Sequence, residues 1–248
     1  MAIRKLKPLR KGFFAYEYVN EKIRDESIKF VDDYETGYIQ IYEDKQYGYP
    51  YAAGGDTAGE GSDWFIGQFL NNATGLQVGM LRHQFDEDLY AKQMYCMGKY
   101  YNYALLGIET NFSTYPVKEL ERLGYIHMYV REVEDSITHN MEKRYGFQTN
   151  KLTRPLAIAA LVTIVREHPE WINDTTTLEE MLTFVRNEKG KATAQKGAHD
   201  DTIMGLAIAY YIRSQQTTQV KHDRPTKTPV QLHKEKLYKQ SKRRKRIM

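Results

Sequence analysis

The feature of this sequence that most constrains its fold is a pair of short apolar runs, each ended by an acidic residue. The first run, YAAGG, covers residues 51–55 and is followed by Asp56, and the second, LLGI, covers residues 105–108 and is followed by Glu109. Runs of this kind are typical of strands buried on both faces of a sheet. A carboxylate at the end of such a strand must meet water, a cation or another acid, so chemistry is expected there.

The elements around the first run predict consecutive hairpins. Strand-like stretches at 49–55, 64–70 and 76–84 are separated by the turn-forming segments TAGEGSD and NNATG. A helix is expected from the acidic triplet at 86–88 to about Tyr101, since carboxylates favour the amino end of a helix.

After this helix the order of elements changes. Residues 104–108 predict a strand, 116–123 a helix and 126–130 another strand. A strand, a helix and a strand in succession imply parallel pairing through a crossover.

The last third of the globular region predicts helices and one hairpin. A helix is expected at 156–165, and Thr177 with Glu180 suggests a capping box for a shorter helix. Residues 184–197 contain NEKGK, a plausible hairpin tip, and 203–212 predict a strongly apolar helix with an acidic first turn. Cys96 lies between two methionines at helical spacing, which favours a packed core position.

Together these elements predict an α/β fold of the ribonuclease H-like class, a mixed sheet flanked by helices. Residues 1–48 predict a basic segment followed by a small antiparallel β extension, because aromatic, alternating runs there are broken by turn residues. The nuclease-like domain is expected at 49–213, with a β-hairpin near the acids, and 214–248 are expected to form a basic, flexible tail.

Charge is divided unevenly along the chain. The formal net charge of +4 is made of +5 in residues 1–12, +9 in 221–248 and −10 in the remainder. Basic ends around an acidic body suggest a polyanionic partner, although a solvated acidic surface with a disordered tail fits equally well. No run approaches the roughly 20 apolar residues of a membrane span, so no membrane partner is expected.

The acids form a candidate metal site. Asp56 and Glu109 at two strand ends, with Asp200 and Asp201 at the start of a helix, would repel one another unless divalent cations neutralise them. Hard oxygen ligands suit Mg²⁺ or Mn²⁺, and two such ions can clamp the attacking and leaving oxygens of a phosphoryl displacement. Taken singly, each acid fits a turn or a helix cap, and only the combination indicates a site.

Two neighbouring residues have open roles. Asp63 fits an accessory ligand or, slightly better, a turn residue. His199 could coordinate metal, polarise a phosphate or cap the helix.

Four segments carry a resemblance to a known family: AAGGDTAGEGSDWF, ALLGIETNFSTYPVKELERLGY, EEMLTFVRNEKGKATAQKGAHDD and IMGLAIAYYI. They resemble the nuclease domain of the large terminase subunit of tailed bacteriophages, which cuts concatemeric DNA during genome packaging. The resemblance covers roughly residues 10–213. It implies a two-metal endonuclease acting on double-stranded viral DNA.

The resemblance also implies roles for individual residues. Asp56 is expected to be the bridging metal ligand, Glu109 the second catalytic acid and Asp201 the third, with Asp200 and His199 beside them. Which aspartate of the pair ligates metal stays open. A DNA-gating hairpin is implied for 187–197, which carries Lys189, Lys191 and Lys196.

A whole large terminase also carries an ATPase, and no G-x-x-x-x-G-K-[ST] loop occurs in this sequence. The chain is therefore expected to be a nuclease domain separated from its motor, whether expressed separately or as a natural fragment. The resemblance implies the terminase ATPase domain, the small terminase subunit and the portal as partners, in the cytoplasm of a bacterial host.

Two other functions compete with the nuclease. Asp56 with the three residues after it, DTAG, also resembles a phosphate loop of actin-like ATPases, but no second loop of that kind is present. A DNA-docking or motor-coupling module without catalysis is the other alternative.

The tail poses a separate question. Five consecutive cations, Lys242, Arg243, Arg244, Lys245 and Arg246, predict contacts to DNA phosphates that are insensitive to sequence. A tail that is only solvated, or that docks another packaging protein, is equally compatible with this pattern.

Overall fold

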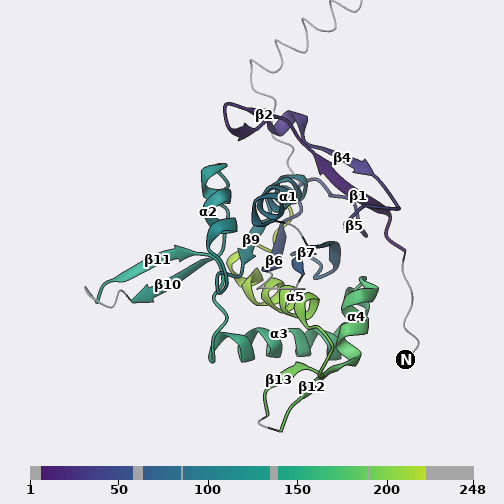
Figure 1. Ribbon diagram of the computed structural model, residues 1–248, viewed down its shortest axis with the longest axis vertical. Coiled ribbons are helices and arrows are strands. Elements are labelled where there is room, and N and C mark those ends of the chain that lie inside the picture. Colours follow the sequence, from purple (N-terminus) through teal and green to yellow (C-terminus); the bar gives the residue numbers. More distant parts are fainter. Residues whose placement is uncertain (1–6, 58–63, 85, 135–138, 189, 222–248) are drawn as a thin grey trace, which may run out of the picture.

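The computed structural model describes residues 7–57, 64–84, 86–134, 139–188 and 190–221 (Figure 1). Within them, a seven-stranded mixed sheet with the order β4-β1-β5-β8-β7-β6-β9 is flanked by helices. The predicted fold class, an α/β ribonuclease H-like mixed sheet, is confirmed. No helix in these ranges is long and apolar enough to cross a bilayer.

The centre of the sheet is built as the apolar runs predict. Strands β6 (Tyr51–Asp56), β7 (Phe65–Asn71) and β8 (Gln77–His83) form consecutive antiparallel pairs. Strand β9 (Leu105–Ile108) lies parallel to β6, on the side away from β7. Every residue of β9, and every residue of β6 except Asp56, is buried, as expected for strands covered on both faces.

The amino-terminal strands extend the same sheet. Strand β1 (Arg10–Ala15) pairs with both β4 (Lys29–Asp32) and β5 (Ile39–Ile41), and β5 pairs with β8. The predicted β extension is therefore continuous with the main sheet. A two-residue ribbon, β2 (Tyr18–Val19) with β3 (Lys22–Ile23), and the turn η1 (Asp25–Ser27) connect these strands.

Helices cover the two faces of the sheet in separate groups. Tyr51 and Ala53 pack in one core with helix α1 (Glu87–Tyr100) and helix α2 (Tyr115–Arg122), while the intervening Ala52 packs in a second core. That second core holds α3 (Thr153–Glu167) and α5 (Asp201–Ile212), with α4 (Thr175–Leu182) beside them. Short helices η2 (Pro169–Trp171) and η3 (Arg213–Gln215) follow α3 and α5. Alternating side chains of β6 thus face opposite helical layers. Figure 1 shows these layers, with α1 and α2 on one side of the sheet and α3 and α5 on the other.

Two hairpins project from this body. The predicted hairpin at 184–197 is present as β12 (Phe184–Arg186) paired antiparallel with β13 (Ala192–Ala194). The other hairpin, β10 (Val130–Glu134) with β11 (Met141–Tyr145), is absent from the sequence-based assignment because its exposed, charged strands lack an apolar alternation. The strand predicted at 126–130 is shorter than expected: Met128 bridges Leu106, and the Leu106 backbone bonds to the His127 carbonyl at 3.0 Å and to the Tyr129 amide at 2.8 Å. These contacts are parallel, as the predicted crossover requires.

One helix start differs from its prediction. Helix α4 is capped by Asp174, whose carboxylate accepts a hydrogen bond from the Thr177 amide nitrogen at 2.6 Å. Thr177 lies inside the first turn, so the capping box predicted from Thr177 and Glu180 is wrong. Cys96 is fully buried in the core, as predicted.

Candidate active site

Two acids lie side by side at the carboxyl ends of the parallel strands β6 and β9. Asp56 is the last residue of β6, and Glu109 directly follows β9, with its amide nitrogen donating to the Gly55 carbonyl at 2.9 Å. The carboxyl group of Glu109 lies close enough to that of Asp56 to raise the Asp56 pKa, second only to burial as a cause. The parallel register therefore produces the convergence that the strand-end pattern predicts.

Helix α5 brings two further acids to the same edge. It crosses β6 at Gly54, where a Cβ atom would lie only 2.1 Å from the Gly205 carbonyl oxygen. Glycine at this position permits the close approach of helix and strand. The helix then begins beside the strand end, and Asp200 and Asp201 lie at its first turn.

The aspartates of α5 are not needed as helix caps. Asp200 makes no side-chain capping bond; instead Glu180 of α4 accepts hydrogen bonds from the Thr202 amide at 3.0 Å and its hydroxyl at 2.5 Å. A carboxylate from another helix thus satisfies the start of α5. Helix capping therefore does not explain why two aspartates stand at the start of α5.

Asp200 and Asp201 are held differently. Arg154 of α3 donates from its Nη2 to the Asp200 Oδ2 at 2.7 Å, with both side chains about four-fifths buried. Asp201 Oδ2 accepts from the Trp64 amide at 3.4 Å and lies 3.7 Å from His199 Nδ1. Asp200 is thus neutralised by a guanidinium, whereas Asp201 lies beside the imidazole of His199.

The electrostatics of the cluster oppose ionisation of Asp56. Burial, the adjacent Glu109 and then the two aspartates of α5 raise the pKa of Asp56 well above its usual range. Glu109 is itself only 5% exposed. The pKa of Tyr90, which lies beneath the pair and donates to the Ile66 carbonyl, is also raised, by burial and by these two acids. Excess negative charge of this kind is relieved by a bound cation.

The four acids line one cavity of about 450 Å³. Thr57 and Asn111 add uncharged oxygens, and Arg154 and Lys191 bring positive charge to the same cavity. A polar cavity with carboxylates at its base and cations at its rim is suited to a substrate that carries phosphates.

The carboxylates of the acid cavity are the donors available to the divalent metals that the sequence suggests. Within the described residues, no three His, Cys, Asp or Glu side chains are already gathered at metal-binding distance. Burial and the neighbouring Glu109 raise the pKa of Asp56, and Asp200 is turned to Arg154. The hard oxygen donors and their concentrated negative charge nevertheless fit Mg²⁺ or Mn²⁺.

The other candidates from the sequence fall into three groups. His199 and Lys191 line the acid cavity, whereas Lys196 is exposed and does not. Asp63, Lys189 and the basic cluster Lys242 to Arg246 lie outside the described residues.

Arg154 is the main residue that the sequence reasoning missed. It lies before the helix predicted at 156–165 and carries no motif of its own, so only tertiary structure brings it to Asp200. Its Nε is buried without a hydrogen-bond partner.

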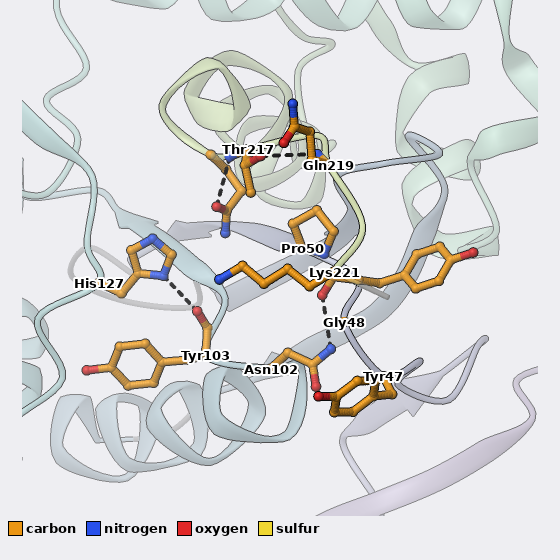
Figure 2. Close-up of a pocket in the computed structure, with 11 residues that line it drawn as sticks. Tyr47, Gly48, Pro50, Asn102, Tyr103, His127, Thr217, Gln219 and Lys221 are labelled. Carbon is orange, nitrogen blue, oxygen red and sulfur yellow. Dashed lines mark hydrogen bonds between the residues drawn. The ribbon is translucent and has the colours of Figure 1, made fainter. Parts of the chain in front are cut away.

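A larger cavity, of about 570 Å³, lies at the opposite edge of the sheet, beside the amino ends of β6 and β9 (Figure 2). Tyr47, Tyr103, His127 and Lys221 contribute to its lining, and His127 Nδ1 lies 2.7 Å from the Tyr103 carbonyl. No carboxylate lines it. Its size therefore does not make it the candidate site for metal chemistry.

No protein-family model matches the sequence, and a comparison with curated proteins gives no match. Solved structures are similar in fold. The large terminase nuclease from thermophilic phage G20c aligns with a TM-score of 0.55 and 19% identity, covering 81% of this chain and 92% of that one. The same nuclease with bound magnesium gives a TM-score of 0.56 at 18% identity, with the same coverage.

The nuclease domain of the large terminase of Thermus phage P74-26 is a further match. It aligns with a TM-score of 0.54 and 21% identity over 70% of this chain and 85% of that domain. Identities this low establish the fold and leave the chemistry to be argued from the site. The chain therefore has the fold of phage large terminase nuclease domains.

Proposed function

We propose that this chain is a metal-dependent endonuclease that cuts double-stranded DNA by two-metal phosphodiester hydrolysis. The observation that carries the proposal is the convergence of Asp56, Glu109 and Asp201 from three elements far apart in the sequence, lining one cavity. Burial and mutual repulsion make this cluster costly, as the raised pKa of Asp56 indicates. Such clusters are typical of functional sites.

Each side chain has a distinct role in this proposal. Asp56 and Glu109 would hold Mg²⁺ or Mn²⁺ jointly, and Asp201 would complete the set from α5. Bound divalent ions supply Lewis-acid stabilisation of the phosphoryl oxygens and a nucleophilic water at neutral pH. Arg154 keeps Asp200 neutralised and so directs the ligand role to Asp201.

The remaining groups at the cavity orient the substrate. Lys191 lies at the rim, where an ammonium group would bind a phosphate of the DNA backbone. His199, close to Asp201 and 45% exposed, is placed to hold or release a proton at the water-accessible side of the acids.

The biological setting proposed here follows from the similar structures, which are named as large terminase nucleases. We infer that the substrate is a viral DNA concatemer, cut during genome packaging in the cytoplasm of a bacterial host. The ATPase domain of the terminase, the small subunit and the portal would then be its partners.

Metal-dependent nicking of a supercoiled plasmid tests the proposal. We expect nicked and linear products with Mg²⁺ or Mn²⁺, none with EDTA, and a loss of activity in Asp56→Asn and Glu109→Gln. Folding is checked by circular dichroism. Undiminished nicking by a folded Asp56→Asn protein would refute the site, and DNA binding without nicking would favour the docking module.

A further inference from the structure

A second cavity, of about 360 Å³, adjoins the acid cavity, between helix α3 and the hairpin β12–β13. We call it the α3 groove. Arg154 and Lys191 line both cavities, so the two meet at these residues. Figure 1 shows the hairpin beside α3, and Arg154 links them by donating to the Ala192 carbonyl at 3.4 Å.

The α3 side of the groove is a single helical stripe. Arg154, Ile158, Val162 and Arg166 are spaced four residues apart, which places them on one face of the helix. The two ends of the stripe are cationic and its middle is apolar. Ile158 is buried, whereas Val162 is 38% exposed and so faces the groove.

The opposite side adds positive charge from the hairpin. Arg186 donates to the Gly190 carbonyl at 3.1 Å, which fixes its guanidinium at the groove, and Lys191 lies beside it. Among the described residues, the lining thus holds three arginines and one lysine and no carboxylate. Neither Arg166 nor Arg186 has an ion-pair partner among the described residues.

Unneutralised cations around an apolar floor fit a phosphodiester backbone, whose phosphates meet the cations while its sugars lie on the apolar stripe. The twelve residues from Arg154 to Arg166 span about 18 Å of helix, at roughly 1.5 Å per residue. This length matches about five base-pair rises at roughly 3.4 Å each.

We propose that the α3 groove binds the backbone of the DNA strand that enters the acid cavity. Arg166 would hold a phosphate about five base pairs from the scissile one, and Arg186, which pairs with Ala192 beside Arg154, would hold a phosphate closer to it. The inference rests on the proposed nuclease function. It adds the path that the bound DNA follows away from the acid cavity, along α3. Arg154 lies at the junction, between Asp200 and the groove.

Binding of a fluorescent 30-base-pair duplex in EDTA tests this without cleavage. The double variant Arg166→Glu/Arg186→Glu should bind at least tenfold more weakly than wild type at low salt. Its slope of log affinity against log salt should be smaller by about 1.8, because each lost phosphate contact accounts for roughly 0.9.

The matched control is Lys22→Glu/Lys118→Glu, which changes the net charge equally at exposed positions on β3 and α2. It should weaken binding less than threefold. Equal losses in the two double variants would show only a general charge effect and would overturn the groove, as would unchanged binding by the arginine variant. Arg166→Gln/Arg186→Gln repeats the test with milder changes if the glutamates impair folding.

Plasmid nicking separates this inference from the proposed function. If wild type nicks DNA but its affinity is indifferent to the two arginines, the groove fails and the nuclease stands. If wild type never nicks but its affinity depends on them, the groove stands and the nuclease fails. A groove that instead docks a protein partner would leave duplex affinity unchanged and would also overturn the proposal.

Discussion

The two ends of the parallel strands β6 and β9 are built on opposite principles. At their amino ends, buried tyrosine hydroxyls are bonded within the protein: the Tyr101 hydroxyl lies 2.9 Å from the Val78 carbonyl and 3.1 Å from that of Glu43, and the Tyr125 hydroxyl donates to the Ala104 carbonyl. At their carboxyl ends, burial and neighbouring acids raise the pKa of Asp56. We infer that the amino ends stabilise the fold, whereas the carboxyl ends are suited to a bound cation.

Replacing Asp56 should give the largest effect. Asp56→Asn should lower metal-dependent cleavage by about a thousandfold or more, equivalent to roughly 4 kcal/mol of barrier. Single-turnover nicking measures this. Asp44→Asn, which alters an exposed acid bonded to the Tyr100 hydroxyl near the amino ends of the strands, should cleave like wild type. Comparable losses of cleavage in both variants would show that the amino and carboxyl ends of β6 and β9 do not differ in their role in catalysis.

The same substitution should have the opposite effect on stability. Because Asp56 is ionised only at a cost in the metal-free fold, Asp56→Asn should raise the free energy of unfolding by about 1 kcal/mol or more in EDTA near neutral pH. Tyr101→Ala should instead lower it by about 3–5 kcal/mol, since it empties a fully buried aromatic site. Urea unfolding measures both changes. A destabilised Asp56→Asn protein would show that the carboxyl end is structural too.

Added metal should stabilise the folded protein through the carboxyl ends of β6 and β9 alone. At a concentration one hundred times its dissociation constant, Mg²⁺ should raise the free energy of unfolding of wild type by about 2.7 kcal/mol. Thermal unfolding with and without EDTA measures this. The rise should vanish in Asp56→Asn, and an equal rise in both proteins would place the metal elsewhere.

The sequence predicts some parts of this structure better than others. The apolar runs ended by Asp56 and Glu109 predict both the parallel pair and the convergence of acids, because strand burial and strand direction follow from local pattern. The fold was predictable for the same reason wherever elements carry an apolar stripe. The hairpin β10–β11 was not, since its charged strands hold their register by cross-strand pairing.

Contacts between helices that are far apart in the sequence could not be predicted either. The cap of α5 by Glu180, and the pairing of Arg154 with Asp200, join residues 22 and 46 positions apart and carry no spacing signal. Those two contacts are the basis on which we propose Asp201, rather than Asp200, as the metal ligand.

The smallest expected loss of cleavage is that of Asp200→Asn, the other member of that aspartate pair. Asp201→Asn should lose cleavage nearly as completely as Asp56→Asn, whereas Asp200→Asn should lose only about tenfold, since its carboxylate is engaged by Arg154. Nicking rates at saturating Mn²⁺ measure the difference. A larger loss in Asp200→Asn than in Asp201→Asn would reverse the assigned roles.

A crystal of the chain soaked in Mn²⁺ tests most directly whether the carboxyl end is a metal site. Anomalous scattering should give peaks bounded by Asp56, Glu109 and Asp201, with the Arg154–Asp200 pair intact. Well-ordered acids at saturating Mn²⁺ with no peak between them would contradict the proposed site.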